Sequence, residues 1–452
     1  MSVNSQLNYG AARAVDIVQA LAARQVSALE LFDEAVARIE AQDTAINAVV
    51  VHDFERAREA AQAADLALAR GERRPLLGLP MTVKEAFDVA GLPTSWGAPQ
   101  FRDAIAATDA VAVQRLRAAG AVILGKTNVA LNLGDWQTVN PIHGRTENPL
   151  DPSRTPGGSS GGSAAALAAG YVPLEFGSDI GGSIRVPAGF CGVYGHKPTY
   201  ELVPQRGHKP GGVDEAPVPL NVVGPMARSA ADLTLALDVT AGPDMDLAVG
   251  YRLSLPPPRR ERLADYRVLV LDSHPLCVTG VEIRDAMERL ADWLSRHGAT
   301  VGRSSPLLPD FAAAQRAYSV LVTSIFSLGD PTRRSPHSAH DWLNALTLQT
   351  VMRRRWAELF REWDVVAAPV YGVAAFPHDD RPQVERTLII DGSATRYMDQ
   401  IAWPGVATFP HLPATSVPIA RTAEGMPIGV QLIGPYLEDR TTIHLAGLLE
   451  HV

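Results

Sequence analysis

The chain has 452 residues, of which 46% are hydrophobic and 20% are charged, and its formal net charge is −8. This composition is typical of a globular protein with enough apolar residues for a large core. The negative balance, with basic residues scattered along the chain, gives no support for a nucleic-acid partner.

Other simple features exclude further classes of protein. Two cysteines, Cys191 and Cys277, are too few for a disulfide framework, which favours a reducing, cytoplasmic location. The N-terminus lacks the layout of a secretory signal, and no apolar run approaches the ~20 residues of a membrane helix, so we expect no membrane partner. Histidine, cysteine and carboxylate residues do not share the spacing of a metal site. We therefore expect chemistry without a metal or another cofactor.

The first part of the chain alternates between helical and strand patterns. Residues 14–48 are predicted to form helices, with a capping box at Ser27 and Glu30 followed by apolar residues at helical spacing. The apolar run Leu76–Val83 is predicted as a strand, residues 109–119 as a helix, and residues 121–125 as a buried strand. This alternation predicts an α/β sheet with helices packed on it.

Residues 134–162 have a different character, with four prolines and then a glycine cluster. They are predicted as a loop, and a loop this long in a compact fold is usually functional. A helix of small residues is predicted at 163–170, a strand at 172–176, and a second glycine-rich turn at 177–183.

A proline- and arginine-rich stretch at 250–262 separates these elements from the rest of the chain. After it we predict a strand at 267–271, a helix at 281–297 ended by Gly298, a helix at 339–363 and a strand at 365–370. One α/β domain over 1–452 is expected. Its parts are N-terminal helices (14–70), a core segment (about 75–245), a helical excursion (about 250–360) and a C-terminal core segment (about 363–452). The chain ends inside a predicted helix, which leaves open whether a C-terminal tail follows.

Three segments carry residues suited to catalysis. Lys84 ends an apolar strand, where burial would lower its pKa, although taken alone it is equally a lysine whose amine reaches water. Ser159 and Ser160 lie between two glycine pairs. A flexible linker fits this segment poorly because the segment runs directly into a helix, and the spacing of a phosphate-binding loop is missing.

The third segment contains Ser183 directly after Gly181 and Gly182. Paired glycines allow successive backbone N–H groups to converge on an anion, which an acyl-transfer enzyme needs for its oxyanion. Asp179 and Arg185 are expected to brace this loop as an ion pair.

The two glycine–serine segments resemble the amidase signature family. That family has a GGSSGG loop followed by GSDxGGSxR, with its two serines 24 positions apart, as Ser159 and Ser183 are here. The family lysine ends a segment similar to GLPMTVK, which places it at Lys84. Further similar stretches are GKTN (125–128), GPMARSAADL (224–233) and GMPIGVQLIGP (425–435), so the likeness covers nearly the whole chain.

The resemblance implies a single domain with a central mixed, twisted β-sheet covered by helices on both sides. It implies hydrolysis of a small linear amide at its C–N bond to a carboxylate plus ammonia or an amine. Ser183 would be the nucleophile, while Ser159, after a cis peptide bond at Gly158–Ser159, would pass the proton to Lys84 and later to the leaving amine. The oxyanion donors implied by the resemblance are the backbone N–H groups of Ile180, Gly181, Gly182 and Ser183.

One stretch departs from the family pattern. Many relatives follow GKTN with a proline and a glutamate, whereas this chain has Val129–Leu131 and then LGDWQ (133–137). Leu133, Trp136 and Ser160 are candidate pocket residues, and Trp96, Trp136 and Tyr318 are either pocket or core residues. The substrate therefore stays open between aliphatic and aryl amides, with anilides or esters as side substrates.

Three alternatives compete with this interpretation. An α/β-hydrolase esterase would use one of two overlapping GxSxG patterns and a histidine such as His143 or His411, but no apolar strand precedes either pattern.

An amidotransferase-type subunit that generates ammonia would have similar loops and would need partner subunits. The LGDWQ segment favours a free-standing enzyme. A non-catalytic binding protein is disfavoured because Lys84, Ser159 and Ser183 are all present. Whether the chain forms a homodimer is left open.

Overall fold

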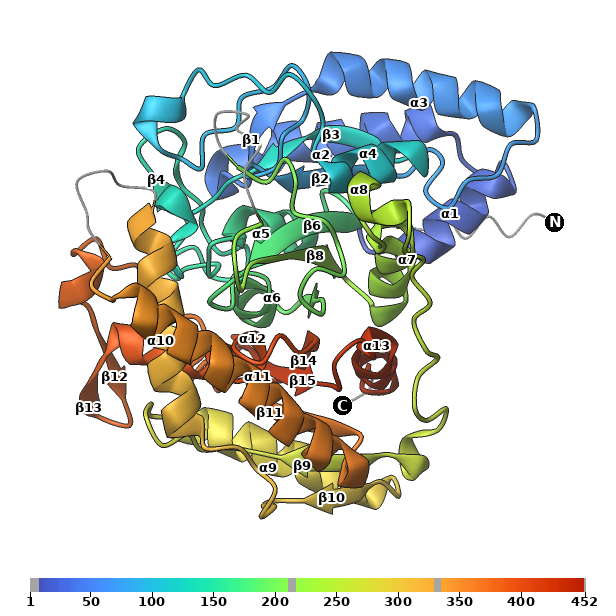
Figure 1. Cartoon of the computed structure of the whole chain (residues 1–452). Coiled ribbons are helices and arrows are strands. Elements are labelled where there is room, and N and C mark those ends of the chain that lie inside the picture. The colour runs from blue at the N-terminus through green and yellow to red at the C-terminus, as the bar shows by residue number, and fades with distance from the viewer. Residues whose placement is uncertain (1–7, 210–216, 329–334, 451–452) are drawn as a thin grey trace.

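A mixed eight-stranded β-sheet forms the centre of the computed structural model (Figure 1), which describes residues 8–209, 217–328 and 335–450. The sheet order is β10-β9-β11-β15-β14-β7-β8-β6, with parallel pairing only at β10–β9 and β9–β11. Its strands are β6 (Leu174–Asp179), β7 (Tyr194–Lys197), β8 (Val222–Ala227), β9 (Arg267–Val270), β10 (Thr300–Gly302), β11 (Val365–Pro369), β14 (Ala414–Arg421) and β15 (Pro427–Ile433).

A smaller three-stranded sheet, in the order β1-β3-β2, lies beside β6 at one edge of the large sheet. Its strands are β1 (Val49–His52), β2 (Pro80–Lys84) and β3 (Val122–Thr127). Two short hairpins complete the described strands: β4 (Val139–Asn140) with β5 (Gly144–Arg145), and β12 (Thr387–Ile390) with β13 (Ser393–Arg396).

Helices cover both faces of the large sheet. In β14 the hydroxyl of Ser416 donates to the carbonyl of Arg185 in α6 (Arg185–Cys191), whereas that of Thr415 donates to Thr442 in α13 (Asp439–Leu448). Because neighbouring residues of a strand point to opposite faces, α6 and α13 lie on opposite sides. The predicted α/β fold with a central mixed sheet is therefore confirmed.

The remaining helices of the described residues precede β1 or occur between strands. They are α1 (Ala14–Ala22), α2 (Ala28–Ile46), α3 (Phe54–Ala69), α4 (Val111–Ala118), α5 (Gly161–Ala168), α7 (Ala230–Thr240), α8 (Met245–Ala248), α9 (Val281–Arg296), α10 (Phe311–Leu328), α11 (Ala339–Glu362) and α12 (Ala402–Thr408). Short 3₁₀ turns occur at Pro99–Phe101, Leu131–Leu133, Leu263–Asp265, Gln383–Glu385 and Tyr397–Ile401. The capping box predicted at Ser27 and Glu30 is present at the start of α2.

Several predicted strands have different bounds in the structure. The strand predicted at 121–125 is β3, which runs from Val122 to Thr127. The run predicted from Leu76 becomes a strand only at Pro80, because a turn at Gly78 (φ +85°) precedes it. The strand predicted at 172–176 continues through Gly177 and Ser178 to Asp179, since its neighbour β8 pairs with all of these residues. Pairing with a neighbouring strand here outweighs the weak strand preference of glycine. The second glycine-rich turn therefore begins at Ile180.

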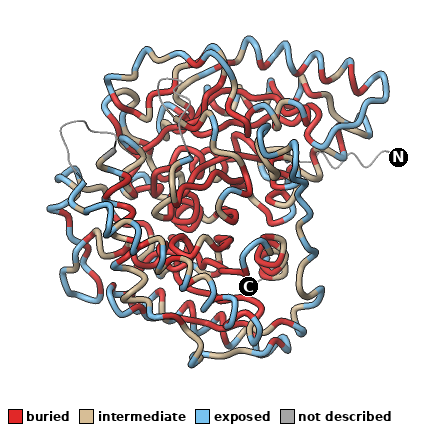
Figure 2. Tube along the Cα trace, viewed as in Figure 1, coloured by how far each residue is buried: buried red, intermediate tan, exposed pale blue. Residues whose placement is uncertain are grey.

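The segment predicted as a helical excursion, about 250–360, carries α9, α10 and α11 but also adds β9 and β10 to the edge of the sheet. Figure 2 shows that buried residues concentrate in the sheets and in α5 and α6, while the outer side of α3 is exposed. Both cysteines are free and buried. No helix in the described part of the chain is long and apolar enough to cross a membrane.

Candidate active site

Lys84 is the last residue of β2 and is fully buried where this strand meets β6. Its Nζ atom donates hydrogen bonds to Oγ of Ser159 (2.8 Å) and to Oγ of Ser178 in β6 (2.9 Å). The structure thus brings the predicted lysine and one predicted serine into direct contact. Ser178 was not predicted as a partner. Its place on the strand face next to Lys84 follows from the extension of β6, which the sequence pattern did not indicate.

Burial lowers the pKa of Lys84 from 10.5 to about 7, because water no longer solvates the charged amine. The carboxylates of Asp179, Glu175 and Glu85 act in the opposite direction and raise this pKa, but they do not outweigh burial. A lysine in this setting can be neutral near pH 7, and a neutral amine can accept a proton.

Ser159 and Ser183 are held on adjacent stretches of backbone. Ser159 follows a cis peptide bond at Gly158, as the resemblance implies, and its neighbour Ser160 donates its N–H to the carbonyl oxygen of Ser183 (3.2 Å). Ser183 is 8% exposed and Ser159 is 1% exposed, so the serine that can meet a substrate is Ser183. A side chain at Gly158 would collide with the carbonyl oxygen of Asp135, which explains the glycine at this position.

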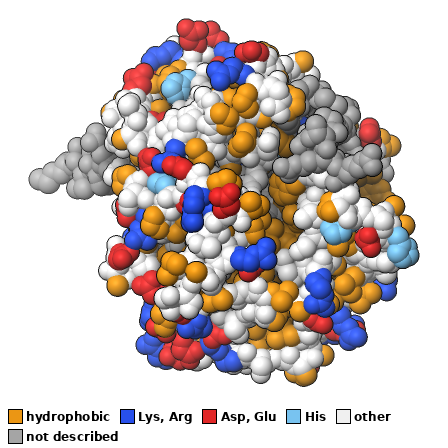
Figure 3. All heavy atoms as spheres, turned by 90° about the vertical axis from the view of Figure 1, so that its left-hand side faces the viewer, with side chains coloured by type: hydrophobic (Ala, Val, Ile, Leu, Met, Phe, Trp, Pro, Cys, Tyr) orange, Lys and Arg blue, Asp and Glu red, His pale blue; other side chains and the backbone are white. Residues whose placement is uncertain are grey.

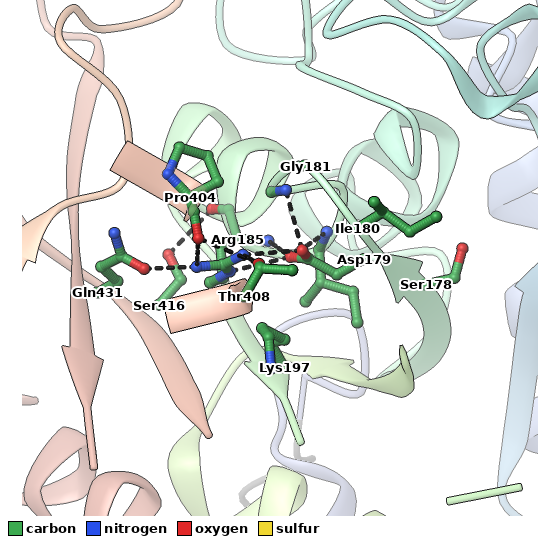
Figure 4. A network of polar contacts seen from close by, with 12 residues as sticks. Ser178, Asp179, Ile180, Gly181, Arg185, Lys197, Pro404, Thr408, Ser416 and Gln431 are labelled. Carbon is green, nitrogen blue, oxygen red and sulfur yellow. Dashed lines mark hydrogen bonds and ion pairs between the residues drawn. The ribbon is translucent and has the colours of Figure 1, made fainter. Parts of the chain in front are cut away.

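The ion pair predicted between Asp179 and Arg185 is present and is fully buried (2.8 Å; Figure 4). One oxygen of Asp179 also accepts the N–H of Gly182 (2.9 Å), and the other accepts that of Ile184 (3.1 Å). Arg185 is fixed in turn by contacts to the C-terminal half of the chain: the carbonyl of Pro404, Thr408 in α12 and Gln431 in β15. Burial alone would raise the pKa of Asp179, but the Arg185 guanidinium outweighs it and holds this pKa at about 2.

Comparisons with known proteins identify the family to which this chain belongs. The family model for amidases matches residues 30–331 and 322–443. AtzE of Pseudomonas sp. (strain ADP), which belongs to 1-carboxybiuret hydrolase, is 36% identical over 453 residues, covering 93% of this chain and 94% of that protein. The chain belongs to the amidase signature family.

Further comparisons agree with this assignment. One of the glutamyl-tRNA(Gln) amidotransferase subunits of Anaeromyxobacter sp. (strain K) is 34% identical and covers 95% of this chain and 94% of that protein. A solved crystal structure of an amidase superposes with a TM-score of 0.81 at 30% identity, over 97% of this chain and 99% of that one. As a member of the amidase signature family, the chain is an amide hydrolase that acts on C–N bonds other than peptide bonds.

The α/β-hydrolase alternative is wrong. An elbow of that kind needs a strand directly before its serine, whereas the described residues from 146 to 158 form turns and loop. The two histidines considered for it have other surroundings. His411 stacks on Tyr200 and forms a hydrogen bond with the side-chain amide of Gln349. Burial lowers the pKa of His143 to about 4.

The predicted pocket residues lie in different settings. Leu133 is half-buried in the 3₁₀ turn after the GKTN segment, and Trp96 is half-buried too. The Ser160 hydroxyl is fully buried and lies against the backbone of Ser178 in β6 (3.4 Å to its carbonyl oxygen), so it does not face a pocket. Trp136 and Tyr318 are 5% and 0% exposed, respectively. On the side of the molecule where α10 lies, Figure 3 shows a hollow at mid-height that is lined by hydrophobic side chains.

Two buried acidic and polar groups near Lys84 were also missed. Glu175 in β6 is fully buried, and burial raises its pKa to about 7. Thr82 in β2 is two residues before Lys84, and its buried hydroxyl lies beside Glu175 and lowers the pKa of that carboxyl, which partly offsets the effect of burial. An acidic residue inside an apolar strand (VPLEF) was a signal that could have pointed to Glu175.

Proposed function

We propose that this amidase signature enzyme hydrolyses its substrate through an acyl-enzyme on Ser183, with Ser159 and Lys84 as its proton relay. The observation that carries the proposal is the 2.8 Å contact between Lys84 Nζ and Ser159 Oγ in a site where burial lowers the pKa of the lysine to about 7. A serine hydroxyl is a weak nucleophile until a base removes its proton, and a neutral lysine can supply that base.

The proposed reaction proceeds in two halves. Ser183 Oγ attacks the amide carbonyl carbon while its proton passes to Ser159 Oγ, whose own proton passes to Lys84 Nζ. The relay then returns a proton through Ser159 to the departing nitrogen, the C–N bond breaks, and ammonia or an amine leaves. Water attacks the resulting ester, and the same relay takes its proton and returns one to Ser183 Oγ, which releases the carboxylate.

The tetrahedral oxyanion requires hydrogen-bond donors aimed at the carbonyl oxygen in the transition state. We assign this role to backbone N–H groups of the loop formed by Ile180, Gly181, Gly182 and Ser183. The N–H of Gly182 donates to Asp179 Oδ1, so it can serve the oxyanion only by sharing or leaving that contact.

The substrate is proposed to be a small, linear and uncharged amide. An apolar hollow lies on the side of α10, and α10 carries Tyr318, whose hydroxyl donates to Ile180 three residues before Ser183. We infer that this hollow receives an aliphatic or aryl acyl group rather than a charged one. The chemistry needs no metal in this proposal. Among the described residues, no group of three or more His, Cys, Asp and Glu side chains is placed to hold a metal ion. A cytoplasmic location stays part of the proposal.

A second candidate function is an amidotransferase-type subunit that generates ammonia. The 34% identity to the glutamyl-tRNA(Gln) amidotransferase protein of Anaeromyxobacter favours it. Ammonia release only in the presence of partner subunits would identify this second function. Turnover of simple amides by the purified chain would identify the first.

The test of the mechanism combines Ser183→Ala with a fluorophosphonate probe. Ser183→Ala should lower kcat by several orders of magnitude in a panel of amides assayed for ammonia or amine release, with an unchanged circular dichroism spectrum. Mass spectrometry of the labelled wild-type enzyme should locate the probe on Ser183. Labelling of Ser160 with Ser183 unmodified would refute the assignment.

A further inference from the structure

Two buried aromatic side chains donate hydrogen bonds to the backbone of the oxyanion loop, which comprises residues 180–183. The Tyr318 hydroxyl in α10 donates to the carbonyl oxygen of Ile180 (2.7 Å), and the Trp136 indole Nε1 donates to that of Gly181 (2.8 Å). Both contacts are as short as strong neutral hydrogen bonds. The polar atoms of these aromatic residues are therefore occupied by the loop backbone.

The next two carbonyl groups of the loop are also held from outside it. The oxygen of Gly182 accepts the N–H of Val186 (2.7 Å), and that of Ser183 accepts the N–H of Ser160 (3.2 Å). Each carbonyl of residues 180–183 thus has a defined donor. Only the first two of these donors are side chains, and they are the ones that a substitution can remove.

A planar trans peptide group fixes the direction of its N–H once its carbonyl is held, because the two bonds point in opposite directions. The Tyr318 contact therefore sets the N–H of Gly181 to point away from α10. In the next peptide group, the Trp136 contact holds the carbonyl of Gly181 while the N–H of Gly182 is held by Asp179. By the same argument, the bond from Val186 to Gly182 orients the N–H of Ser183.

These relations separate the N–H groups of residues 181–184 into two sets. Those of Gly182 and Ile184 donate to the Asp179 carboxylate. Those of Gly181 and Ser183 belong to peptide groups whose carbonyl oxygens accept from Tyr318 and Val186, so each of these N–H groups points away from that donor. The N–H groups of Gly181 and Ser183 are thus the ones oriented for a ligand.

The two aromatic donors are themselves held firmly. Gly405 packs on the Tyr318 ring so closely that a Cβ there would lie 2.9 Å from ring carbons, and the hydroxyl-bearing ring is fully buried. The Trp136 ring meets the ring of Tyr397 edge-on, with centroids 5.2 Å apart. Donors with so little freedom keep the loop in one arrangement before substrate binds.

We propose that Tyr318 and Trp136 are positioning residues that preorganise the oxyanion-binding N–H groups of Gly181 and Ser183. This inference rests on the proposed function, because it assumes that Ser183 forms the tetrahedral intermediate. Fixed donors stabilise charge that develops in the transition state more than they stabilise the bound amide. Their loss should therefore lower kcat and leave KM nearly unchanged.

The test is Tyr318→Phe, which removes only the hydroxyl. We expect kcat to fall roughly 10- to 100-fold, because an oxyanion donor that is displaced, but still present, loses only part of its stabilisation of the transition state. KM should stay within about threefold, and the affinity for a trifluoromethyl ketone analogue of the substrate should fall by the same factor as kcat. Trp136→Phe should act in the same direction and provides a second, independent variant.

Tyr371→Phe is the matched control. Its ring packs edge-on against Trp136 at 5.2 Å and is buried, but its hydroxyl has no hydrogen-bond partner among the described residues. This variant should keep wild-type kcat and wild-type affinity for the ketone.

Three results would overturn the inference. The first is a Tyr318→Phe enzyme with the kcat of Tyr371→Phe. The second is a rise in KM alone, which would make Tyr318 a substrate-contacting residue. The third is a fall in kcat without a fall in affinity for the ketone. Fluorophosphonate labelling of wild-type Ser183 distinguishes a failure of the proposed function from a failure of the positioning role alone. If Ser183 is not labelled, the proposed function fails; if it is labelled and both variants retain kcat, only the positioning role fails.

Discussion

The pH dependence of turnover tests whether Lys84 acts as the base. In the proposed relay only the neutral amine can accept a proton, so kcat/KM should rise with pH through the pKa of Lys84 in the folded enzyme. Burial lowers that pKa from 10.5 to about 7. The change corresponds to about 5 kcal/mol, at roughly 1.4 kcal/mol for each tenfold change in the acid dissociation constant.

The size of the effect follows from the fraction of neutral lysine. With a pKa of about 7, roughly 10% of the amine is neutral at pH 6 and roughly 90% at pH 8, so kcat/KM should rise about tenfold between them. A lysine with the unperturbed pKa of about 10.4 would be neutral in less than roughly 1% of molecules at pH 8. The position of the acid limb therefore reports directly on the burial of Lys84.

Lys84→Arg is the decisive variant. Arginine keeps a positive charge and a long stem, but it stays protonated and has no acceptor, so it cannot serve as the base. Turnover should fall on the order of 10²- to 10⁴-fold, nearly as far as in Lys84→Ala. The assay is kcat/KM between pH 5.5 and 9 with an amide that does not titrate in this range, with folding checked by circular dichroism. Near-normal turnover of Lys84→Arg at neutral pH would show that Lys84 acts only as a fixed charge.

Three further predictions concern the surroundings of this base. Activity should survive EDTA and the replacement of His143 or His411 by alanine, and a loss that zinc restores would contradict the metal-free mechanism. Glu175, whose own pKa is about 7, is partly ionised near the midpoint of the acid limb and in that form raises the pKa of Lys84. Glu175→Gln removes this charge, so the midpoint of the kcat/KM limb should move to lower pH; a midpoint that stays in place or moves up would count against this coupling. Asp179→Asn leaves a buried guanidinium without its charged partner and should lower the free energy of unfolding by ~3–5 kcal/mol in urea titrations, so an unchanged midpoint would be inconsistent with the buried pair.

Elements with strong local signals were predicted well from the sequence. Helix α2 begins at the capping box of Ser27 and Glu30, and α9 ends before Gly298, which has a φ of +89°. Caps and glycine turns act within a few residues, so the local sequence is sufficient to locate them. The bounds of β2 and β6 were predicted less well, because pairing with neighbouring strands decides where a strand begins and ends.

The candidate site also contains residues that were predicted from the sequence and residues that were missed. The family motifs indicated Lys84, Ser159 and Ser183, whose chemical roles stay predictions, and the short spacing of Asp179 and Arg185 was enough to predict their ion pair. Ser178 was missed because its contact with Lys84 joins two different sheets.

The roles of Trp136 and Tyr318 could not be predicted because each depends on a partner far away in the chain. The indole of Trp136 meets a carbonyl 45 residues away, and the hydroxyl of Tyr318 meets one 138 residues away. Buried aromatic residues commonly fill a core, and nothing in their local sequence distinguishes a core residue from a backbone donor.

Asp179 links the geometry of the oxyanion loop to the chemistry of the base. Its carboxylate holds the N–H groups of Gly182 and Ile184, and it is also the strongest of the charges that raise the pKa of Lys84. A carboxylate that holds the loop thus works against the neutral lysine that the proposed relay needs. Burial outweighs this effect on Lys84. Arg185, 2.8 Å from Asp179, helps to keep that carboxylate ionised while leaving its oxygens in place to accept the loop N–H groups. The buried pair therefore allows an ionised carboxylate to order the loop in a site where the pKa of the lysine stays at about 7.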